Sequence, residues 1–284
     1  MEKKRILIIG ATGMLGHMVH KYFEGLENYE LFNSVYRNPL NDKSIVCNVK
    51  DQNAVKKLFE QTKPDVVINC VGALVQESQN NPASAIYLNA LFPYVLRDLS
   101  NICGAKLIHI STDCVFSGIK GAYGEDDFRD SDDVYGRSKA LGEILDAFHC
   151  TLRTSIIGPE LKDGTGLFHW FMKQEGEVKG YTHAFWGGVT TLELAKAIEK
   201  AIKYELNGVF QVTNGSKISK FDLLSLFNQY KVNPTRIVPF ENYTVDKSLK
   251  KSNKFDFEVP NFDIQMKELQ DFIKKSISYS YHIK

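Results

Sequence analysis

With 284 residues, the chain is long enough to bury a substantial core in one large domain or two modest ones. Its 35 Lys and Arg residues nearly balance 34 Asp and Glu residues, so the net charge is +1 and a general polyanion binder is excluded; we expect no nucleic-acid partner. With 43% hydrophobic and 24% charged residues, the chain also falls outside the disordered, collagen-like and coiled-coil classes.

The cysteines and the apolar run near the start of the chain indicate the cellular compartment in which the protein is expected. The five cysteines are widely spaced with no Cys-x-x-Cys pair, which predicts neither a disulfide framework nor a zinc site, and no metal is expected. The apolar run at residues 6–9 is far too short to span a bilayer and lacks a signal-peptide cleavage pattern. We therefore expect no membrane partner and a cytoplasmic protein.

Short β-branched runs alternate with longer stretches of helical period along the first two thirds of the chain. This alternation predicts an α/β fold with a Rossmann-type, doubly wound parallel sheet. Strands are expected at residues 5–9, 31–36, 44–47, 65–70, 106–110, 151–153 and 208–212. Helices are expected at residues 14–26, 52–61, 83–103, 134–148 and 191–204, with Pro93 bending or breaking the third of them.

The alternation weakens after about residue 155, where Gly, aromatic and charged residues become frequent. We interpret this change as a second, smaller α/β domain that binds substrate, assembled from residues of about 156–188 and 214–284. Residues 1–155, with about 189–213, would then form the NAD(P)-binding Rossmann domain.

A glycine-rich turn follows the first predicted strand and opens a helix. In Gly10-Ala-Thr-Gly13-Met-Leu-Gly16, the first glycine permits a tight turn, the second lets the backbone approach a pyrophosphate, and the third allows close helix–sheet packing. The free N–H groups of the helix N-terminus favour an anion there. We predict dinucleotide contacts at Gly10, Thr12, Gly13, Met14, Leu15 and Gly16.

The second predicted strand ends in Arg37 with no acidic residue to bind an adenosine 2′-hydroxyl. Because arginine pairs with a 2′-phosphate, this favours NADPH, with NADH left open. The carboxyl ends of the next strands should meet the same crevice. Further cofactor contacts are therefore expected at Asn48, Val49, Cys70, Val71 and Gly72.

Tyr135 and Lys139 are four residues apart, so both project from one face of a helix. A nearby ammonium group and an oxidised nicotinamide would bring the phenol pKa into a useful range. Thr112 ends the fifth predicted strand at the same edge. We predict that Thr112 hydrogen-bonds a substrate carbonyl, that Tyr135 protonates it, and that Lys139 holds the nicotinamide ribose.

Several segments together carry a family resemblance: residues 111–118 (STDCVFSG), 135–139 (YGRSK), 142–143 (GE), 152–155 (LRTS) and 194–195 (LA), with Tyr123, Glu125 and Asp126 between the first two. The chain resembles, over nearly its whole length, the dTDP-4-dehydrorhamnose reductase family of extended short-chain dehydrogenase/reductases. The resemblance implies reduction of a 4-keto sugar carried on a nucleoside diphosphate. It places Thr112, Tyr135 and Lys139 on the family's catalytic positions and Asn89 on a helix position often occupied by Asn. We expect Asn89, Tyr135 and Lys139 to contact the cofactor as well.

The sugar and nucleotide are left open by two departures from the family pattern, Cys114 in place of Tyr and Ile156 in place of Trp. Residues 111–118, with 246–249 (DKSL) and 259–261 (VPN), look closer to reductases that make UDP-linked 6-deoxysugars for surface polysaccharides. Substrate contacts are expected at Cys114, Val115, His169 and Trp186.

Two alternatives remain. Cys114 and His169 stand where GDP-fucose synthase has a cysteine and a histidine, so the chain could be a bifunctional epimerase–reductase that moves ring protons with these side chains. Other members of the fold, such as the regulatory subunit of methionine adenosyltransferase, bind a dinucleotide without catalysis. A homodimer is also open, because superfamily members often dimerise through helices on the sheet faces.

Overall fold

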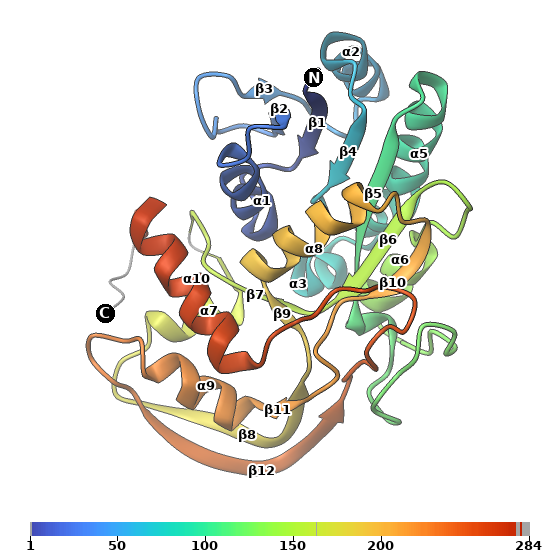
Figure 1. The fold of residues 1–284 in the computed structure, drawn as a ribbon. Helices are drawn as coiled ribbons and strands as arrows, with labels where there is room; N and C mark the ends of the chain where they lie inside the picture. The colour runs from blue at the N-terminus through green and yellow to red at the C-terminus, as the bar shows by residue number, and fades with distance from the viewer. Residues whose placement is uncertain (1, 163, 277–278, 280–284) are drawn as a thin grey trace.

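The computed structural model describes residues 2–162, 164–276 and 279, and its larger part is built on one parallel sheet (Figure 1). Within the described residues this sheet has seven strands in the order β10-β6-β5-β4-β1-β2-β3. The strands are β1 (Lys4–Ile9), β2 (Tyr29–Val35), β3 (Ile45–Val46), β4 (Val66–Asn69), β5 (Lys106–Thr112), β6 (Cys150–Thr154) and β10 (Gly208–Gln211). Every predicted strand is present, and the α/β fold class is confirmed.

Helices cover both faces of this sheet because side chains alternate along each buried strand. Ile6 and Ile8 pack in one cluster with residues of α1 (Met14–Glu24) and α8 (Thr191–Lys203). Leu7 and Ile9 face the other way, toward α2 (Gln52–Thr62) and α5 (Phe92–Cys103). Both faces of β1 are thus fully buried, as a doubly wound sheet requires.

The helix predicted over residues 83–103 is interrupted. It consists of α4 (Pro82–Ala85), a π-helical segment η1 (Ile86–Leu91) and α5, and α3 (Val75–Asn80) precedes it. Pro93 lies in the first turn of α5, directly after the π-helical segment, and the backbone on both sides of that junction stays in the right-handed helical region. The helix therefore changes its hydrogen-bond pattern just before the proline and does not break there.

The helix predicted over residues 134–148 is too long. In the structure α6 (Val134–Leu141) ends at Gly142. A Cβ atom on Gly142 would lie 1.8 Å from the backbone oxygen of Asn89, so the chain here must pass very close to η1. This close approach explains why residue 142 is a glycine, and α6 ends there.

A smaller part lies beside the carboxyl edge of the large sheet, and its individual elements were not predicted from the sequence. Its three-stranded sheet has the order β11-β8-β12, in which β8 (Glu177–Trp186) and β12 (Arg236–Asp246) run parallel and form the long arc below α9 in Figure 1. The remaining elements are η2 (Asp113–Val115), β7 (Ile156–Ile157), α7 (Leu167–Met172), β9 (Val189–Thr190), β11 (Ile218–Ser219), α9 (Lys220–Asn228) and α10 (Phe262–Ser276). The division into two domains stays a prediction.

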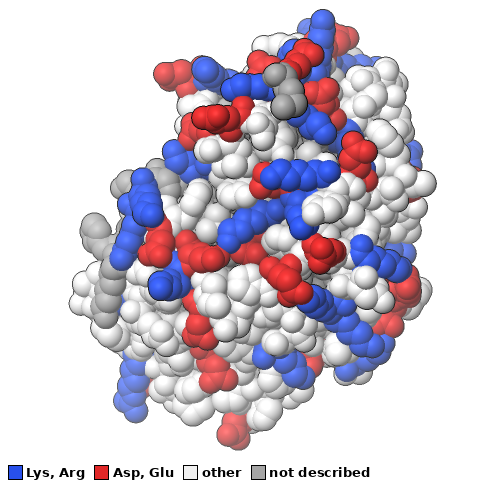
Figure 2. Space-filling model, in the orientation of Figure 1, with Lys and Arg blue, Asp and Glu red and all other residues white. Residues whose placement is uncertain are grey.

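The surface in view carries both signs of charge. Lys and Arg residues alternate with Asp and Glu residues across the face shown in Figure 2. Among the residues that the structure describes, no helix combines the length and the apolar character needed to cross a membrane, and no group of His, Cys, Asp and Glu is arranged to hold a metal ion.

Buried histidines should make the fold sensitive to mild acid. Burial lowers the pKa of His17 from 6.5 to about 4, although its hydrogen bond with the Gly13 carbonyl oxygen acts in the opposite direction. The unfolded chain therefore takes up this proton first, so the stabilisation is present above pH 6.5 and is lost as pH falls toward 4. We expect this residue to account for about 3 kcal/mol of the loss. Urea unfolding between pH 7 and pH 4.5 should show a shallower pH dependence in His17→Asn, whereas the exposed control His183→Asn should keep the parent slope; equal slopes in all three proteins would contradict the assignment.

Candidate active site

The glycine-rich turn has the geometry of an anion cradle. Gly10 has φ +84°, a conformation that side chains other than glycine rarely adopt. A Cβ atom on Gly16 would lie 2.2 Å from the Gly10 carbonyl oxygen, so only glycine lets α1 start this close to β1. Gly13 caps α1 without a side-chain hydrogen bond, which leaves the first N–H groups of the helix available to a ligand.

A cavity of about 350 Å³ opens beside this turn, at the carboxyl ends of the first four strands. Eight of the predicted cofactor residues line it: Gly10, Thr12 and Gly13 in the turn, Asn48 and Val49 after β3, and Cys70, Val71 and Gly72 after β4. Ser34, Tyr36, Lys50, Glu77 and Leu88 also line it and were not singled out from the sequence. Met14, Leu15 and Gly16 belong to the first turns of α1 behind the cradle.

Arg37 is exposed and does not line the cavity. Its guanidinium group lies over the ring of Tyr36, 4.7 Å from the ring centre, and Tyr36 does line the cavity. Arg37 is therefore held at the rim by the aromatic ring, where a ligand phosphate could reach it.

Asn89 is fully buried and its side chain is committed to the protein. Its Oδ1 accepts a hydrogen bond from the Ala73 N–H (2.9 Å), and its Nδ2 donates to the Ala73 oxygen (3.0 Å) and to Ser138 Oγ (3.1 Å). These bonds tie η1 to the segment after β4 and to α6. Asn89 therefore fixes the position of α6, and it does not line the cavity.

Thr112, Tyr135 and Lys139 come together at the end of β5. Burial raises the pKa of the Tyr135 phenol, although the nearby Thr112 side chain acts to lower it. The Thr112 hydroxyl itself donates a hydrogen bond to Asp113 Oδ1 (3.1 Å). The raised phenol pKa differs from the lowering expected from Lys139, whose Nζ donates a 2.6 Å hydrogen bond to the Ile110 carbonyl oxygen. Burial also lowers the pKa of Lys139 to about 8, against the opposing effects of Glu143 and Cys70.

A second cleft, of about 790 Å³, lies between the end of β5 and the smaller part of the structure. Cys114 and Trp186 line it, together with aromatic residues from β8 and β12 such as Tyr181 and Tyr243. Val115 is instead fully buried in a small cluster with Phe116, Tyr123 and Leu249. It supports the wall of the cleft from behind.

His169 and Cys114 are not brought together in this cleft. His169 is 1% exposed within α7 and is absent from the cleft lining, to which α7 contributes Leu167 and Trp170. Burial raises the pKa of Cys114 to about 12, and the neighbouring Asp113 acts in the same direction. A thiol held in its neutral form is a poor base for removing a ring proton.

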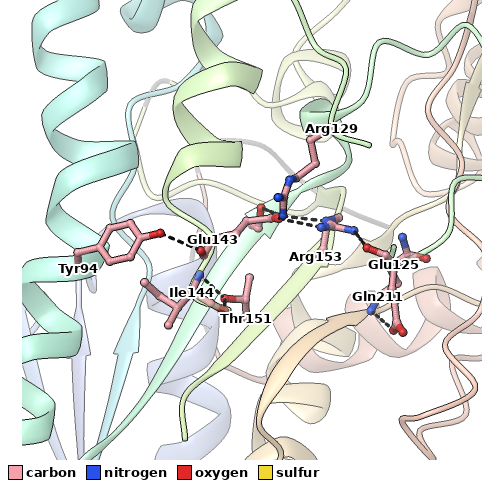
Figure 3. Close-up of polar contacts among 9 residues, drawn as sticks. Tyr94, Glu125, Arg129, Glu143, Ile144, Thr151, Arg153 and Gln211 are labelled. Atoms are coloured by element: carbon pink, nitrogen blue, oxygen red, sulfur yellow. Dashed lines mark hydrogen bonds and ion pairs between the residues drawn. The ribbon is translucent and has the colours of Figure 1, made fainter. Parts of the chain in front are cut away.

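A buried ion network supports the strand that carries Thr112 (Figure 3). The Glu143 carboxylate accepts hydrogen bonds from Arg153 Nε (2.8 Å) and Nη2 (2.7 Å), from Ser111 Oγ (2.7 Å) and from Arg129 Nη1 (2.9 Å). Arg153 and Glu143 are at most 1% exposed. The sequence motif contained both residues, but only the fold shows that they bind each other.

Comparisons with known proteins agree with this architecture. A family model described as the RmlD substrate binding domain matches residues 4–269. The crystal structure of a dTDP-4-dehydrorhamnose reductase from Clostridium acetobutylicum superposes with a TM-score of 0.80 at 25% identity, over 95% of this chain and 99% of that chain. The NADP complex of the Bacillus anthracis dTDP-4-dehydrorhamnose reductase has a TM-score of 0.81 at 22% identity, over 96% and 99% of the two chains, which shows the shared fold.

Curated relatives match over shorter stretches. Methionine adenosyltransferase 2 subunit beta from Danio rerio is 31% identical over 165 residues, 56% of this chain and 50% of its own length. The spore coat polysaccharide biosynthesis protein SpsK from Bacillus subtilis is 34% identical over 144 residues, 50% of this chain and 47% of its own. The match thus covers about half the length of each of these relatives.

Proposed function

Because the chain belongs to the RmlD substrate binding domain family, we propose that it is an oxidoreductase that uses NADPH to reduce the 4-keto group of a nucleotide-linked 4-keto-6-deoxyhexose. The observation that carries the proposal is the docking of α6 on the end of β5, where Lys139 Nζ donates a 2.6 Å hydrogen bond to the Ile110 carbonyl oxygen. Tyr135 lies one turn before Lys139 on α6, and Thr112 ends β5 two residues after Ile110. The product would be a deoxysugar for a surface polysaccharide, the process named for the SpsK relative.

The first cavity suits a dinucleotide. The Gly10 and Gly16 positions that a Cβ atom would fill, and the uncapped start of α1, form a cradle for a pyrophosphate. Arg37, held over Tyr36, would bind the 2′-phosphate that distinguishes NADPH from NADH. The related Bacillus anthracis reductase was solved with NADP.

The reacting carbonyl would lie between Thr112 and Tyr135. The raised pKa keeps the Tyr135 phenol protonated at neutral pH, which is the form that can donate a proton to the carbonyl oxygen. Thr112 would orient that oxygen by a hydrogen bond, and Lys139 would hold the ribose near its own anchor on Ile110. The dinucleotide, when bound, supplies the hydride.

The epimerase–reductase alternative has less support, because His169 lies outside the cleft that contains Cys114. The similarity to methionine adenosyltransferase 2 subunit beta favours a second candidate, a dinucleotide-binding regulatory subunit. A protein with that role has no chemical need for Thr112, Tyr135 and Lys139 together.

Measuring turnover distinguishes the proposed reductase from the regulatory subunit. We expect the chain to oxidise NADPH, followed by absorbance, with one member of a panel of dTDP-, UDP- and GDP-linked 4-keto-6-deoxy sugars, each generated in place by its dehydratase. Parallel reactions with NADH should be slower. Tight NADPH binding without turnover of any sugar in the panel would reject the reductase and favour the regulatory candidate.

A further inference from the structure

The second cleft contains two lysines at the end that lies next to Asp113 and Cys114, just after β5. Lys220 begins α9 and Lys247 directly follows β12, and both line the cleft beside Asp113 and Cys114. Neither lysine forms a salt bridge within 4 Å among those given for the described residues. Asp113 acts electrostatically on both ammonium groups, and Asp133 acts on Lys247 as well.

Other nearby carboxylates are already engaged. Asp246, the neighbour of Lys247, accepts hydrogen bonds from Lys217 Nζ (2.5 Å) and from the Ser248 N–H (3.0 Å). Glu177, also in the cleft lining, pairs with Arg236 at 3.2 Å. Asp133 accepts a hydrogen bond from the Gly136 N–H (2.7 Å) at the start of α6. Because neither Lys220 nor Lys247 has a carboxylate at salt-bridge distance in the described part of the chain, an anion that enters the cleft can pair with both ammonium groups.

Lys247 is held in place by two backbone segments that dock on each other. The Asp246 N–H donates to the Gly118 oxygen (2.9 Å), and the Tyr123 N–H donates to the Ser248 oxygen (2.8 Å). A Cβ atom on Gly118, whose φ is +87°, would lie 3.0 Å from Cγ of Lys247 and 2.4 Å from the Val245 side chain. The loop that follows η2 thus fits closely around the stem of this lysine.

The rest of the cleft is aromatic. Trp170 comes from α7, Tyr181 and Trp186 from β8, and Tyr243 from β12. A ligand that fits both the lysines and the aromatic side chains has an anionic group joined to a flat ring. A nucleoside diphosphate combines the two, because its diphosphate is anionic and its base is flat.

We propose, on the basis of the function proposed above, that Lys220 and Lys247 bind the diphosphate of the nucleotide sugar. This contact orients the substrate in the cleft. The sugar lies toward Thr112 and Tyr135, and the base lies among the aromatic side chains of β8 and β12. Lys220 and Lys247 are thus specificity-determining residues for a nucleoside diphosphate over a monophosphate.

Calorimetric titration of the full chain with UDP, UMP, dTDP and dTMP tests this without requiring turnover. The parent should bind the preferred diphosphate at least about tenfold more tightly than its monophosphate, as expected for charge-assisted hydrogen bonds. Lys247→Met, which keeps the apolar stem, should reduce this preference to about threefold or less, and Lys220→Met should reduce it in the same direction. Lys247→Arg, which retains the charge, should keep most of it.

Lys250→Met is the matched control, because it removes the same charge three residues away from an exposed position outside the cleft lining. It should leave the diphosphate preference unchanged. An unchanged preference in both Lys247→Met and Lys220→Met, or a parent that binds none of the four nucleotides, would overturn the assignment. A Lys247-dependent preference in a chain that reduces no 4-keto sugar would uphold this site while rejecting the proposed reaction.

Discussion

Replacing Tyr135 with phenylalanine should lower kcat by about a hundredfold to ten-thousandfold, the usual contribution of a positioned proton donor. The change removes only the phenol hydroxyl group, and the ring keeps its place on α6. NADPH affinity should therefore stay within about threefold of the parent, because none of the residues lining the first cavity is altered.

The control for this variant is Tyr181→Phe, which removes a hydroxyl group from β8 in the lining of the second cleft. It should change KM more than kcat. Steady-state rates and fluorescence titration of NADPH measure both quantities. A Tyr135→Phe protein with kcat near that of the parent would exclude Tyr135 as the proton donor.

Breaking the buried ion pair should cost more stability than any surface change. Glu143→Gln leaves the Arg153 guanidinium group buried with a hydrogen bond to the Glu125 oxygen (3.3 Å) and a contact with the Phe116 ring, but without a counter-charge. Removing one partner of such a pair typically lowers the free energy of unfolding by about 3–5 kcal/mol. Although burial acts to raise it, hydrogen bonds led by Arg153 hold the pKa of the Glu143 carboxyl below its usual range, which shows that the site favours the charged form.

Chemical denaturation measures this loss, and Glu24→Gln is the control. Glu24 pairs with Lys21 at 2.8 Å on the surface, and such exposed pairs contribute about 0–1 kcal/mol. The double variant Glu143→Gln with Arg153→Met should recover part of the stability lost in Glu143→Gln, because it also removes the unpaired charge. A loss below about 1 kcal/mol in Glu143→Gln would show that the network is not a stabilising unit.

The parallel sheet could be predicted because its strands are short runs rich in apolar and β-branched residues, separated by stretches of helical period. The glycine-rich turn and the spacing of Tyr135 and Lys139 could also be predicted, because each is a pattern formed by residues close together in the sequence. The strand β8 was missed although its exposed and buried positions alternate, because two of its buried positions are Gly180 and Ala184, which add little to an apolar pattern. The strand β12 was missed because it is mostly exposed and contains Pro239. The early end of α6 depends on a contact with η1 that lies more than fifty residues earlier in the chain.

Only part of the candidate site could be predicted, because some of its residues lie in local motifs and others are brought together only by the fold. Thr112, Tyr135 and Lys139 belong to recognisable motifs, and the residues after β3 and β4 follow from strand order alone. Lys220 belongs to no recognised motif, and Lys247 lies in the DKSL segment without a role assigned to it from the sequence. The docking of the end of β12 on the loop around Gly118 holds Lys247 at the cleft. Val115 and His169 were predicted as contacts by neighbourhood in sequence, whereas both side chains are buried.

The residues that line the two cavities come from different stretches of the chain. The ribosome therefore synthesises the two sets one after the other. Every residue that lines the first cavity lies between Gly10 and Leu88, whereas the lining of the second begins at Asp113 and ends at Lys247. A ribosome therefore finishes the complete set of residues for the first cavity before it adds any residue of the second. Synthesis runs from the amino end, so a nascent chain arrested before β12 contains the whole dinucleotide cradle and lacks one wall of the cleft.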